Sequence, residues 1–345
     1  MSVLRFAGVL LLLPLIAAVA GCGGAAPPPG SASPDRGAQA DSSGGGGGGG
    51  GGTLRIVSLT PGITRMLVDL GLGDRLVGVA EFDDAVPEGM NPPVLGHFLD
   101  VDMEKLAIAD PTHILMMVGK EGAPANLVSL AESKGIELVV YPYPKTVADV
   151  ARMLHDPDDE LEPISVGEAV GRPGRAAALR RTLMGGLDAI AAVTARAGDR
   201  PRTLMVIGEG VPVMALGPGG PMHELLHIAG GTNAAAGGTN ENVPAPTFDR
   251  EKLAALDPEV IVLMLPKSPP LGDVATDARL ATFRGLPVPA VDRGEIHLMN
   301  DPEVLLPSTR MLDTAAGLAR LLHPGLAGAI DAAVAEAATE VPSGP

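Results

Sequence analysis

The chain has 345 residues, 41 of them acidic and 25 basic, and its formal net charge is −16. This acidic excess argues against a nucleic-acid partner and against direct adhesion to anionic lipid, because phosphate groups attract basic surfaces. The length allows two domains or one large domain, and the single cysteine, Cys22, excludes an intramolecular disulfide bond.

Residues 1–21 have the pattern of a secretory signal peptide. Arg5 precedes an apolar run over 6–20, which ends in small residues and is too short for a comfortable membrane span. Cys22 follows immediately and resembles the acylated cysteine of the bacterial lipoprotein lipobox. We therefore expect export and a lipid anchor on Cys22 at the cell envelope, in the periplasm or at the outer face of the cytoplasmic membrane. The alternative is an ordinary signal peptide followed by an incidental cysteine.

Residues 22–52 consist mainly of Gly, Ala, Pro, Ser and Asp, with an unbroken glycine run over 44–52. This composition has no apolar periodicity and supplies no core, so it predicts a disordered tether. A flexible chain of roughly 30 residues has an average reach of about 30 Å. The folded part is therefore expected to stay close to the membrane that holds the lipid.

Short apolar runs bounded by Gly and Pro predict buried parallel strands in the first half of the folded part. These runs are 54–59, 76–80, 114–118 and 137–141. A helix is predicted over 63–70, with Thr60 as its N-cap and Pro61 at its first position. Gly71 follows and is expected to end it.

One motif occurs twice in the chain. The residues Glu-Lys-Leu-Ala begin at Glu104 and again at Glu251, and Asp-Pro follows at 110–111 and at 257–258, each 147 positions after its counterpart. Both copies predict a helix that ends at Asp-Pro, because proline disfavours helical backbone in the residue before it. An apolar run follows each copy. Two lobes of similar construction are therefore predicted.

The region between the halves, 172–196, carries apolar residues at helical spacing without a strand signal, and predicts one long connecting helix. Together these patterns predict an α/β protein with two doubly wound lobes, each with a parallel-type sheet, joined by a long interdomain helix, and with a ligand cleft between the lobes. Further strands are predicted at 203–208, 260–265 and 296–299. The predicted segments are an N-terminal lobe at 53–165, the connecting helix at 166–199, a C-terminal lobe at 200–324 and a tail at 325–345.

Several stretches carry a family resemblance through their order and spacing. They are 55–61, 70–79, the helix at Glu104 with 110–111, 225–233, the helix at Glu251 with 257–258, and 318–324. Together they resemble the class III, helical-backbone substrate-binding lipoproteins of ABC importers, the family that binds iron-siderophores, haem or cobalamin. The resemblance implies a monomeric, non-enzymatic protein without an intrinsic cofactor. It would bind a metal chelate and deliver it to an ABC permease and its ATPase.

The resemblance also assigns a role to the repeated glutamates. In that family one glutamate on each lobe meets arginines of the permease, and the matching positions are Glu104 and Glu251. Two exposed carboxylates on rigid lobes would fix the orientation of docking more than its affinity. The alternative is that each carboxylate only lies favourably near the positive end of its helix dipole, which contributes about 0.3–1 kcal/mol.

The ligand is expected beyond the carboxyl ends of the strands, where open α/β sheets bind their ligands. The absence of Trp argues against tight aromatic stacking, and the acidic charge favours a neutral or cationic chelate, either a corrinoid such as cobalamin or an iron-siderophore. His97 is either a metal ligand or an ordinary loop histidine, and the two tyrosines either wall the pocket or lie in a surface loop. The predicted ligand-binding residues are Thr60, Pro61, Phe82, His97, Phe98, Tyr141, Tyr143, Glu209, Met222, His223 and Asn242.

The strand-end loops of the two lobes are expected to face each other. They include 81–84 in the first lobe and 209–211, 266–268 and 301–303 in the second. Lys267 and Arg310 are candidates to pair with acidic groups of a ligand, or are ordinary salt-bridge residues.

A competing motif lies at 223–227, which reads His-Glu-Leu-Leu-His and matches HExxH. On a helix this pattern puts two imidazoles on one face as zinc ligands, with the glutamate as general base. Catalytic zinc needs three protein ligands, but Asn233 stands where the longer pattern has its third histidine, although a carboxylate such as Glu241 would complete a set. The alternative function is therefore a zinc-binding protein or metallopeptidase based on His223 and His227.

Overall fold

The computed structural model describes residues 53–97, 99–158, 163–237 and 243–339. The predicted signal peptide, Cys22 and the tether lie outside the described residues, as do Phe98, Glu241 and Asn242. No helix within the described ranges is both long and apolar enough to cross a lipid bilayer.

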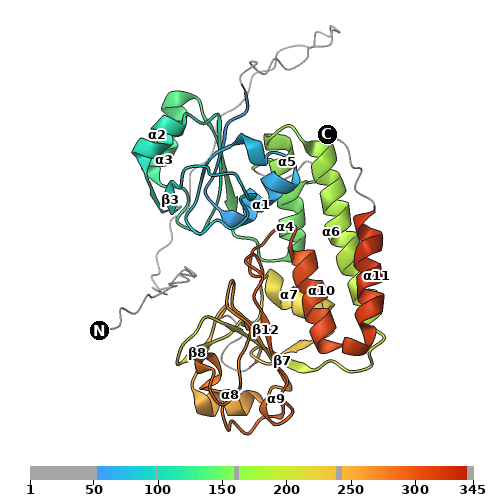
Figure 1. Cartoon of the computed structure of the whole chain (residues 1–345). Coiled ribbons are helices and arrows are strands. Elements are labelled where there is room, and N and C mark those ends of the chain that lie inside the picture. The colour runs from blue at the N-terminus through green and yellow to red at the C-terminus, as the bar shows by residue number, and fades with distance from the viewer. Residues whose placement is uncertain (1–52, 98, 159–162, 238–242, 340–345) are drawn as a thin grey trace, which may run out of the picture. The chain divides into compact units, whose positions relative to one another are not determined.

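The first half of the described chain forms a parallel sheet with the strand order β2-β1-β5-β6 (Figure 1). Its strands are β1 (Ile56–Ser58), β2 (Leu76–Val79), β5 (His113–Val118) and β6 (Glu137–Pro142). Its helices are α1 (Pro61–Asp69), α2 (Met103–Ala109), α3 (Ala125–Lys134) and α4 (Val147–Leu154). Strand β5 is buried almost throughout, which explains why it reads as a continuous apolar run.

Both faces of this sheet are covered. Leu115 and Met117 of β5 belong to a core cluster that includes residues of α1 and α4. Ile114 and Met116 belong to a second cluster, which includes residues of α2 and α3. Because successive residues of a strand point to opposite faces, helices must lie on both sides of the sheet. This is the doubly wound arrangement that the sequence predicts.

The second half forms a parallel sheet with the order β12-β11-β7-β9. Its strands are β7 (Arg202–Ile207), β9 (Thr232–Asn233), β11 (Val260–Met264) and β12 (Ile296–Met299). Its helices are α7 (Pro221–Ile228), α8 (Arg250–Leu256), α9 (Pro289–Asp292) and α10 (Met311–Leu322). The predicted α/β class with two parallel-sheet lobes is thus confirmed. Strand β9 was not predicted, because two polar residues form no apolar run.

Helix α6 (Pro173–Thr194) connects the halves and is 22 residues long. One core cluster contains residues of α6 and of both sheets, so the lobes share part of their interior. The structure differs from the predicted tail at 325–345, because Ala327–Ala338 forms helix α11, which packs along α6 (Figure 1). Ile330 is fully buried there, but the alanine-rich sequence around it has too few large apolar residues to predict an amphipathic helix.

The remaining elements are short. Two antiparallel pairs join β3 to β4 and β8 to β10. The bounds are η1 (Gly73–Arg75), β3 (Gly96–His97), β4 (Asp100–Val101), α5 (Val166–Ala169), β8 (Val213–Met214), β10 (Thr247–Phe248), η3 (Ala278–Leu280) and η4 (Pro324–Leu326).

The repeated motif folds alike in both lobes. Asp102 caps α2 by accepting a hydrogen bond from the backbone N–H of Lys105 at 3.0 Å. Asp249 caps α8 in the same way, with the N–H of Lys252 at 2.9 Å. These caps also lie 147 positions apart, so the repeat extends upstream of the two glutamates.

The helix ends match as well. Asp110 and Asp257 adopt left-handed backbone conformations, with φ of 44° and 46°, and so end α2 and α8. The Nη2 atoms of Arg55 and Arg202 donate to a last-turn carbonyl of α2 and α8, at 2.6 and 2.8 Å. An arginine at the start of each central strand thus neutralises the negative end of the neighbouring helix.

Candidate functional site

The loop after β2 and the loop after β11 meet in the structure. Lys267 in the second loop forms an ion pair with Asp84 in the first. Both residues belong to loops that were predicted to face each other. Lys267 was a candidate partner for ligand acids, and here it has a protein partner. Lys267 and Phe82 also have positive φ angles of 59° and 57°, which is uncommon for residues other than glycine.

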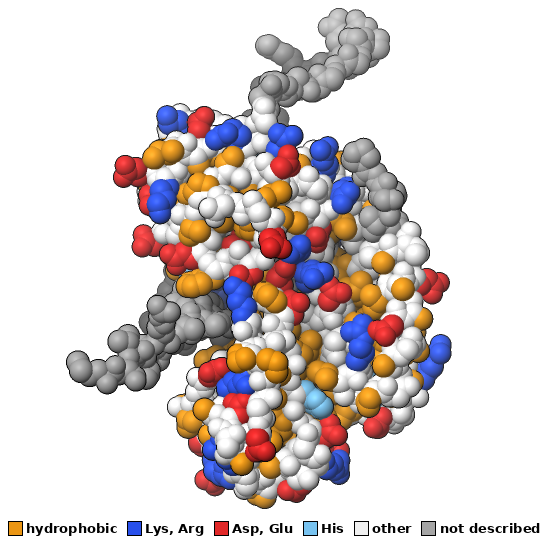
Figure 2. All heavy atoms as spheres, in the orientation of Figure 1, with side chains coloured by type: hydrophobic (Ala, Val, Ile, Leu, Met, Phe, Trp, Pro, Cys, Tyr) orange, Lys and Arg blue, Asp and Glu red, His pale blue; other side chains and the backbone are white. Residues whose placement is uncertain are grey.

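A buried ion pair links α1 to the segment that follows β12. Arg65 donates from Nε and Nη2 to the two carboxylate oxygens of Glu303, at 2.7 and 2.5 Å. The side chains are only 17% and 7% exposed. Beside this pair, a Cβ on Gly62 would lie 2.8 Å from the carbonyl oxygen of Pro307, so the helix and the segment are in close backbone contact. Figure 2 shows basic and acidic side chains beside one another in the middle of the face that it draws.

Asp83, next to this pair, has a raised side-chain pKa. Burial raises the pKa of its carboxyl to about 6, and the charges of Asp84 and Glu303 act in the same direction. The Thr64 hydroxyl opposes the rise by donating to Asp83 Oδ2 at 2.5 Å. The junction of the loops therefore contains a carboxyl group that takes up a proton in mildly acidic solution.

The second lobe has a cavity of about 240 Å³ at the carboxyl ends of β7 and β11. Its walls include the buried side chains of Val206, Leu263, Leu265 and Phe283. Glu209, which was predicted from the sequence as a ligand contact, lies in the lining and is exposed. The position fits the general rule that open α/β sheets bind ligands beyond the carboxyl ends of their strands.

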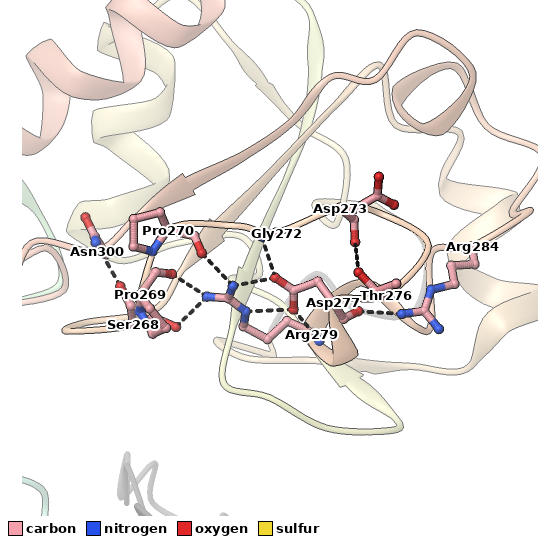
Figure 3. Close-up of polar contacts among 10 residues, drawn as sticks. All are labelled: Ser268, Pro269, Pro270, Gly272, Asp273, Thr276, Asp277, Arg279, Arg284 and Asn300. Carbon is pink, nitrogen blue, oxygen red and sulfur yellow. Dashed lines mark hydrogen bonds and ion pairs between the residues drawn. The ribbon is translucent and has the colours of Figure 1, made fainter.

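Arg279 also lines the cavity, but its guanidinium is engaged by the protein (Figure 3). It pairs with Asp277 through Nε and Nη2, and it donates to the Ser268 hydroxyl and to the carbonyls of Pro269 and Pro270. The guanidinium holds the pKa of Asp277 well below its usual range, mainly through these hydrogen bonds. Arg279 therefore fixes the loop after β11 rather than offering a free cation.

The two histidines of the HExxH stretch lie against each other on α7. Their Nε2 atoms are 3.2 Å apart, and the side-chain amide nitrogen of the buried Asn233 lies 3.2 Å from Nδ1 of His223. Burial lowers the pKa of His223, and burial with the charges of His223 and Arg200 lowers that of His227. Both imidazoles are therefore neutral near pH 7.

The glutamate of this stretch serves a different contact. Glu224 Oε2 accepts a hydrogen bond from the backbone N–H of Val147, at the first turn of α4, at 2.8 Å. It thus joins α7 to α4 and is not set up as a general base. Over the residues that the structure describes, no group of three or more His, Cys, Asp or Glu side chains could hold a metal ion. The zinc alternative is not favoured.

Two predicted ligand contacts lie in the interior of the first lobe. Tyr141 is 1% exposed, and its hydroxyl donates to the Ile164 carbonyl at 2.8 Å, so it presents no surface to a ligand. Burial also raises its pKa. Thr60 is 8% exposed, and its Oγ1 accepts from the N–H of Met117 at 2.9 Å instead of capping α1. Both side chains thus bond within the protein, and their role as ligand contacts stays a prediction.

The other predicted contacts are more accessible. Phe82 is 79% exposed on the loop that also carries Asp84, and Tyr143 is 46% exposed. His97 is half-buried, and its Nδ1 accepts from the N–H of Leu99 at 3.3 Å. Two more, Pro61 in the first turn of α1 and Met222 in the first turn of α7, are partly buried.

Glu104 and Glu251 are exposed in the first turns of α2 and α8. The neighbouring lysines, Lys105 and Lys252, pair with the capping aspartates, at 3.4 and 3.6 Å. Neither glutamate makes an ion pair with the described part of the chain. The two carboxylates therefore stand in closely similar surroundings.

A known family accounts for this combination of two parallel-sheet lobes and a long connecting helix. The sequence profile described as "Periplasmic binding protein" matches residues 56–284. The chain belongs to this family. Periplasmic binding proteins are exported, bind small-molecule ligands and work with an ABC permease and its ATPase.

Individual relatives agree with this assignment. The chain is 26% identical over 210 residues to the vitamin B12-binding protein of Vibrio cholerae. The match covers 60% of the present chain and 69% of the Vibrio cholerae protein. It is 24% identical over 210 residues to an uncharacterized ABC transporter substrate-binding lipoprotein, YvrC, of Bacillus subtilis, covering 60% and 62%. The solved periplasmic haem-binding protein HutB of Vibrio cholerae has the same fold, with a TM-score of 0.64, 20% identity and coverage of 79% and 99%.

Several residues of the junction were not found from the sequence. Arg65 and Glu303 lie 238 positions apart, and no local pattern connects them. Asp83 and Lys267 fell inside loops that were correctly expected to face each other, but their partners could not be assigned. A local signal did exist at Asp277, because an aspartate often accepts a hydrogen bond from the backbone N–H two residues later, here that of Arg279 at 3.0 Å.

Proposed function

We propose that the protein is the substrate-binding component of an ABC importer, which captures a metal chelate between its lobes and delivers it to a membrane permease. The observation that carries this proposal is the family match combined with an apolar cavity at the carboxyl ends of the second sheet. The names of the relatives support a tetrapyrrole-type ligand, since one binds vitamin B12 and another haem. An iron-siderophore belongs to the same broad class.

The charges favour a neutral or cationic chelate. Each basic side chain identified near the strand-end loops has an acidic partner in the protein. The pairs are Arg65 with Glu303, Lys267 with Asp84, Arg279 with Asp277, and Arg310 with Asp313. A ligand with several carboxylates would have to break such pairs, at a cost of a few kcal/mol for a buried one. A corrinoid with amide side chains avoids this cost, so we rank it above haem.

Docking to the permease is assigned to Glu104 and Glu251. Their exposure, their lack of an ion pair with the described residues and their matching surroundings support this role. Arginines on the permease would complement two such carboxylates and orient the complex. The protein is proposed to act as a monomer that presents one carboxylate from each lobe.

Export and anchoring are assigned to residues 1–21 and Cys22. The lipobox-like position of the cysteine supports acylation, and the name of the Bacillus subtilis relative, a lipoprotein, points the same way. Cys22→Ser is expected to move the protein from the membrane fraction to the soluble fraction of expressing cells. A variant that stays with the membranes would argue against the lipid anchor.

The central test is a thermal-shift screen of the purified protein against cyanocobalamin, cobinamide, haemin, ferric siderophores and zinc. A ligand present at 100 times its Kd adds about 2.7 kcal/mol to apparent stability, which gives a visible rise in Tm. A rise with one chelate is the expected result and would identify the cargo. A rise with zinc alone, abolished in His223→Ala, would overturn the proposal in favour of a metal site on α7.

A further inference from the structure

The cavity of the second lobe is small for the proposed ligands. Pockets that enclose a drug-sized molecule have volumes of about 300–1,000 Å³, whereas this cavity measures about 240 Å³. A complete corrin or porphyrin ring does not fit inside it. The cavity therefore suits a peripheral group of the ligand, while the ring stays outside.

The inner walls of the cavity are apolar. Val206, Leu263, Leu265 and Phe283 are between 2% and 6% exposed, and they extend the core of the second lobe to the carboxyl ends of β7 and β11. Gly208 and Gly210 lie in the lining, and a Cβ on either would meet no atom within 4 Å. A group that enters here is stabilised because its apolar surface is removed from water.

The charged groups of the lining offer a free hydrogen-bond acceptor but no free donor. Arg279 has two bonds to Asp277 and further bonds to a hydroxyl and two carbonyls, so its N–H groups are already used. The exposed Glu209 carboxylate makes no hydrogen bond to the described residues, and its charge is felt by Arg279. A group entering the cavity therefore meets an available acceptor but no available charged donor.

We propose that this cavity is a recognition subsite for an N–H donor, an ammonium or an amide, carried on a compact apolar stem of the ligand. The proposal rests on the proposed function and refines it, because it selects chelates with amide or amine substituents over chelates with carboxylates. Glu209 accepts the hydrogen bond, and the apolar walls hold the stem. A carboxylate in the same place would face Glu209 and find no charged donor to neutralise it.

A fragment pair tests the cavity itself. Benzylammonium and benzoate have the same apolar ring and opposite charges, and each is titrated into the full-length protein with 13C-labelled methyl groups. Benzylammonium is expected to shift the methyl resonances of Val206, Leu263 and Leu265 and to bind at least tenfold more tightly than benzoate. Equal binding of the two fragments, or shifts of other methyl groups only, would overturn the proposal.

Three variants separate charge from shape. Glu209→Gln keeps the size of an exposed side chain and should reduce the preference for benzylammonium at least fivefold. Ala278→Leu adds volume to an exposed residue of the lining and should weaken benzylammonium at least tenfold. Ala275→Leu makes the same change at an exposed residue outside the lining and should have no effect. Equal behaviour of the two leucine variants would contradict the assignment of the cavity.

Chelate titrations distinguish this inference from the proposed function. Cobinamide carries amides, ferrioxamine B carries an ammonium group, and haemin carries carboxylates. The expected result is binding of an amide or ammonium chelate that weakens at least tenfold in Ala278→Leu and is unchanged in Ala275→Leu. If the Ala278→Leu variant binds the chelate as tightly as wild type, the subsite proposal is overturned and the proposed transport function still stands. Failure of every chelate, with the fragment preference preserved, contradicts the transport function and leaves the cavity as a site for N–H donors.

Discussion

The two lobes are alike around α2 and α8 but differ directly after their central strands. With the offset of 147 that relates those helices, Pro61 corresponds to Gly208. In the first lobe the chain turns at once into α1, whereas in the second lobe Gly208, with φ of 77°, begins a loop and the next helix starts only at Pro221. The space beyond β7 is thereby left for the cavity, whereas α1 fills the space beyond β1. The two lobes thus share the ends of α2 and α8, while the segments that follow their central strands differ.

The largest expected effect tests the similarity of the lobes. Glu104→Ala combined with Glu251→Ala should reduce chelate uptake at least 100-fold in cells that express the transporter, because both carboxylates proposed for docking are lost. Chelate affinity, measured by calorimetry, should stay within twofold of wild type. The control is Glu132→Ala with Glu336→Ala, two exposed carboxylates elsewhere, which should transport normally. A fall in chelate affinity in the docking variant would sink the assignment.

The second prediction concerns the ion pair that joins α1 of the first lobe to the segment after β12 in the second lobe. Arg65→Ala leaves the buried Glu303 carboxylate without its partner and should lower the free energy of unfolding by about 2–4 kcal/mol. The matched control is Arg75→Ala, whose pair with Asp74 is 41% and 59% exposed, with an expected loss below about 0.5 kcal/mol. Urea unfolding curves measure both changes. Equal losses in the two variants would show that the Arg65 pair does not stabilise the junction.

The third prediction uses the raised pKa of Asp83. Asp83 has a pKa of about 6 in the folded protein and an ordinary pKa of 3.8 when unfolded, so the folded protein binds the proton more tightly. Its stabilising contribution is therefore complete below pH 3.8 and is lost as the pH rises through 6. Asp83→Asn should match wild type near pH 4 and exceed it by about 2 kcal/mol at pH 7.5.

Urea midpoints at both pH values give the test of this carboxyl. Asp188→Asn, an exposed site on α6, serves as the control and should change stability equally at the two pH values. A stability difference between Asp83→Asn and wild type that is independent of pH would contradict the assignment.

The smallest effect compares two helix starts of the same sequence. Both α1 and α6 begin with Pro-Gly, at Gly62 and Gly174. Gly62→Ala would bring a methyl group within 2.8 Å of the Pro307 carbonyl and should destabilise by about 1–2 kcal/mol. Gly174→Ala meets no atom within 4 Å and should stabilise by about 0.5 kcal/mol. Thermal unfolding should show Tm changes of opposite sign, and a shared sign would refute the close contact.

The sequence predicted the features that depend on residues close together in the chain. The strand at Val260–Met264 could be predicted because burial on both faces of the sheet requires an unbroken apolar run. Helix α6 could be predicted because its apolar residues recur at helical spacing. Contacts between distant segments leave none. The partner of Arg65 and the burial of Tyr141 depend on how α1, β6 and the later segments pack, so no local pattern predicted either. Helix α11 was missed because its contact face holds few large apolar residues, Ile330 and Val334, among alanines.

The continuous core through α6 has a consequence for engineering. Side chains of both sheets share one cluster with α6, α10 and α11, and α10 and α11 come from the end of the described chain. A fragment that stopped after the first lobe would expose the apolar face that those helices cover. Chimeras that exchange one lobe between relatives must therefore carry the matching set of helices.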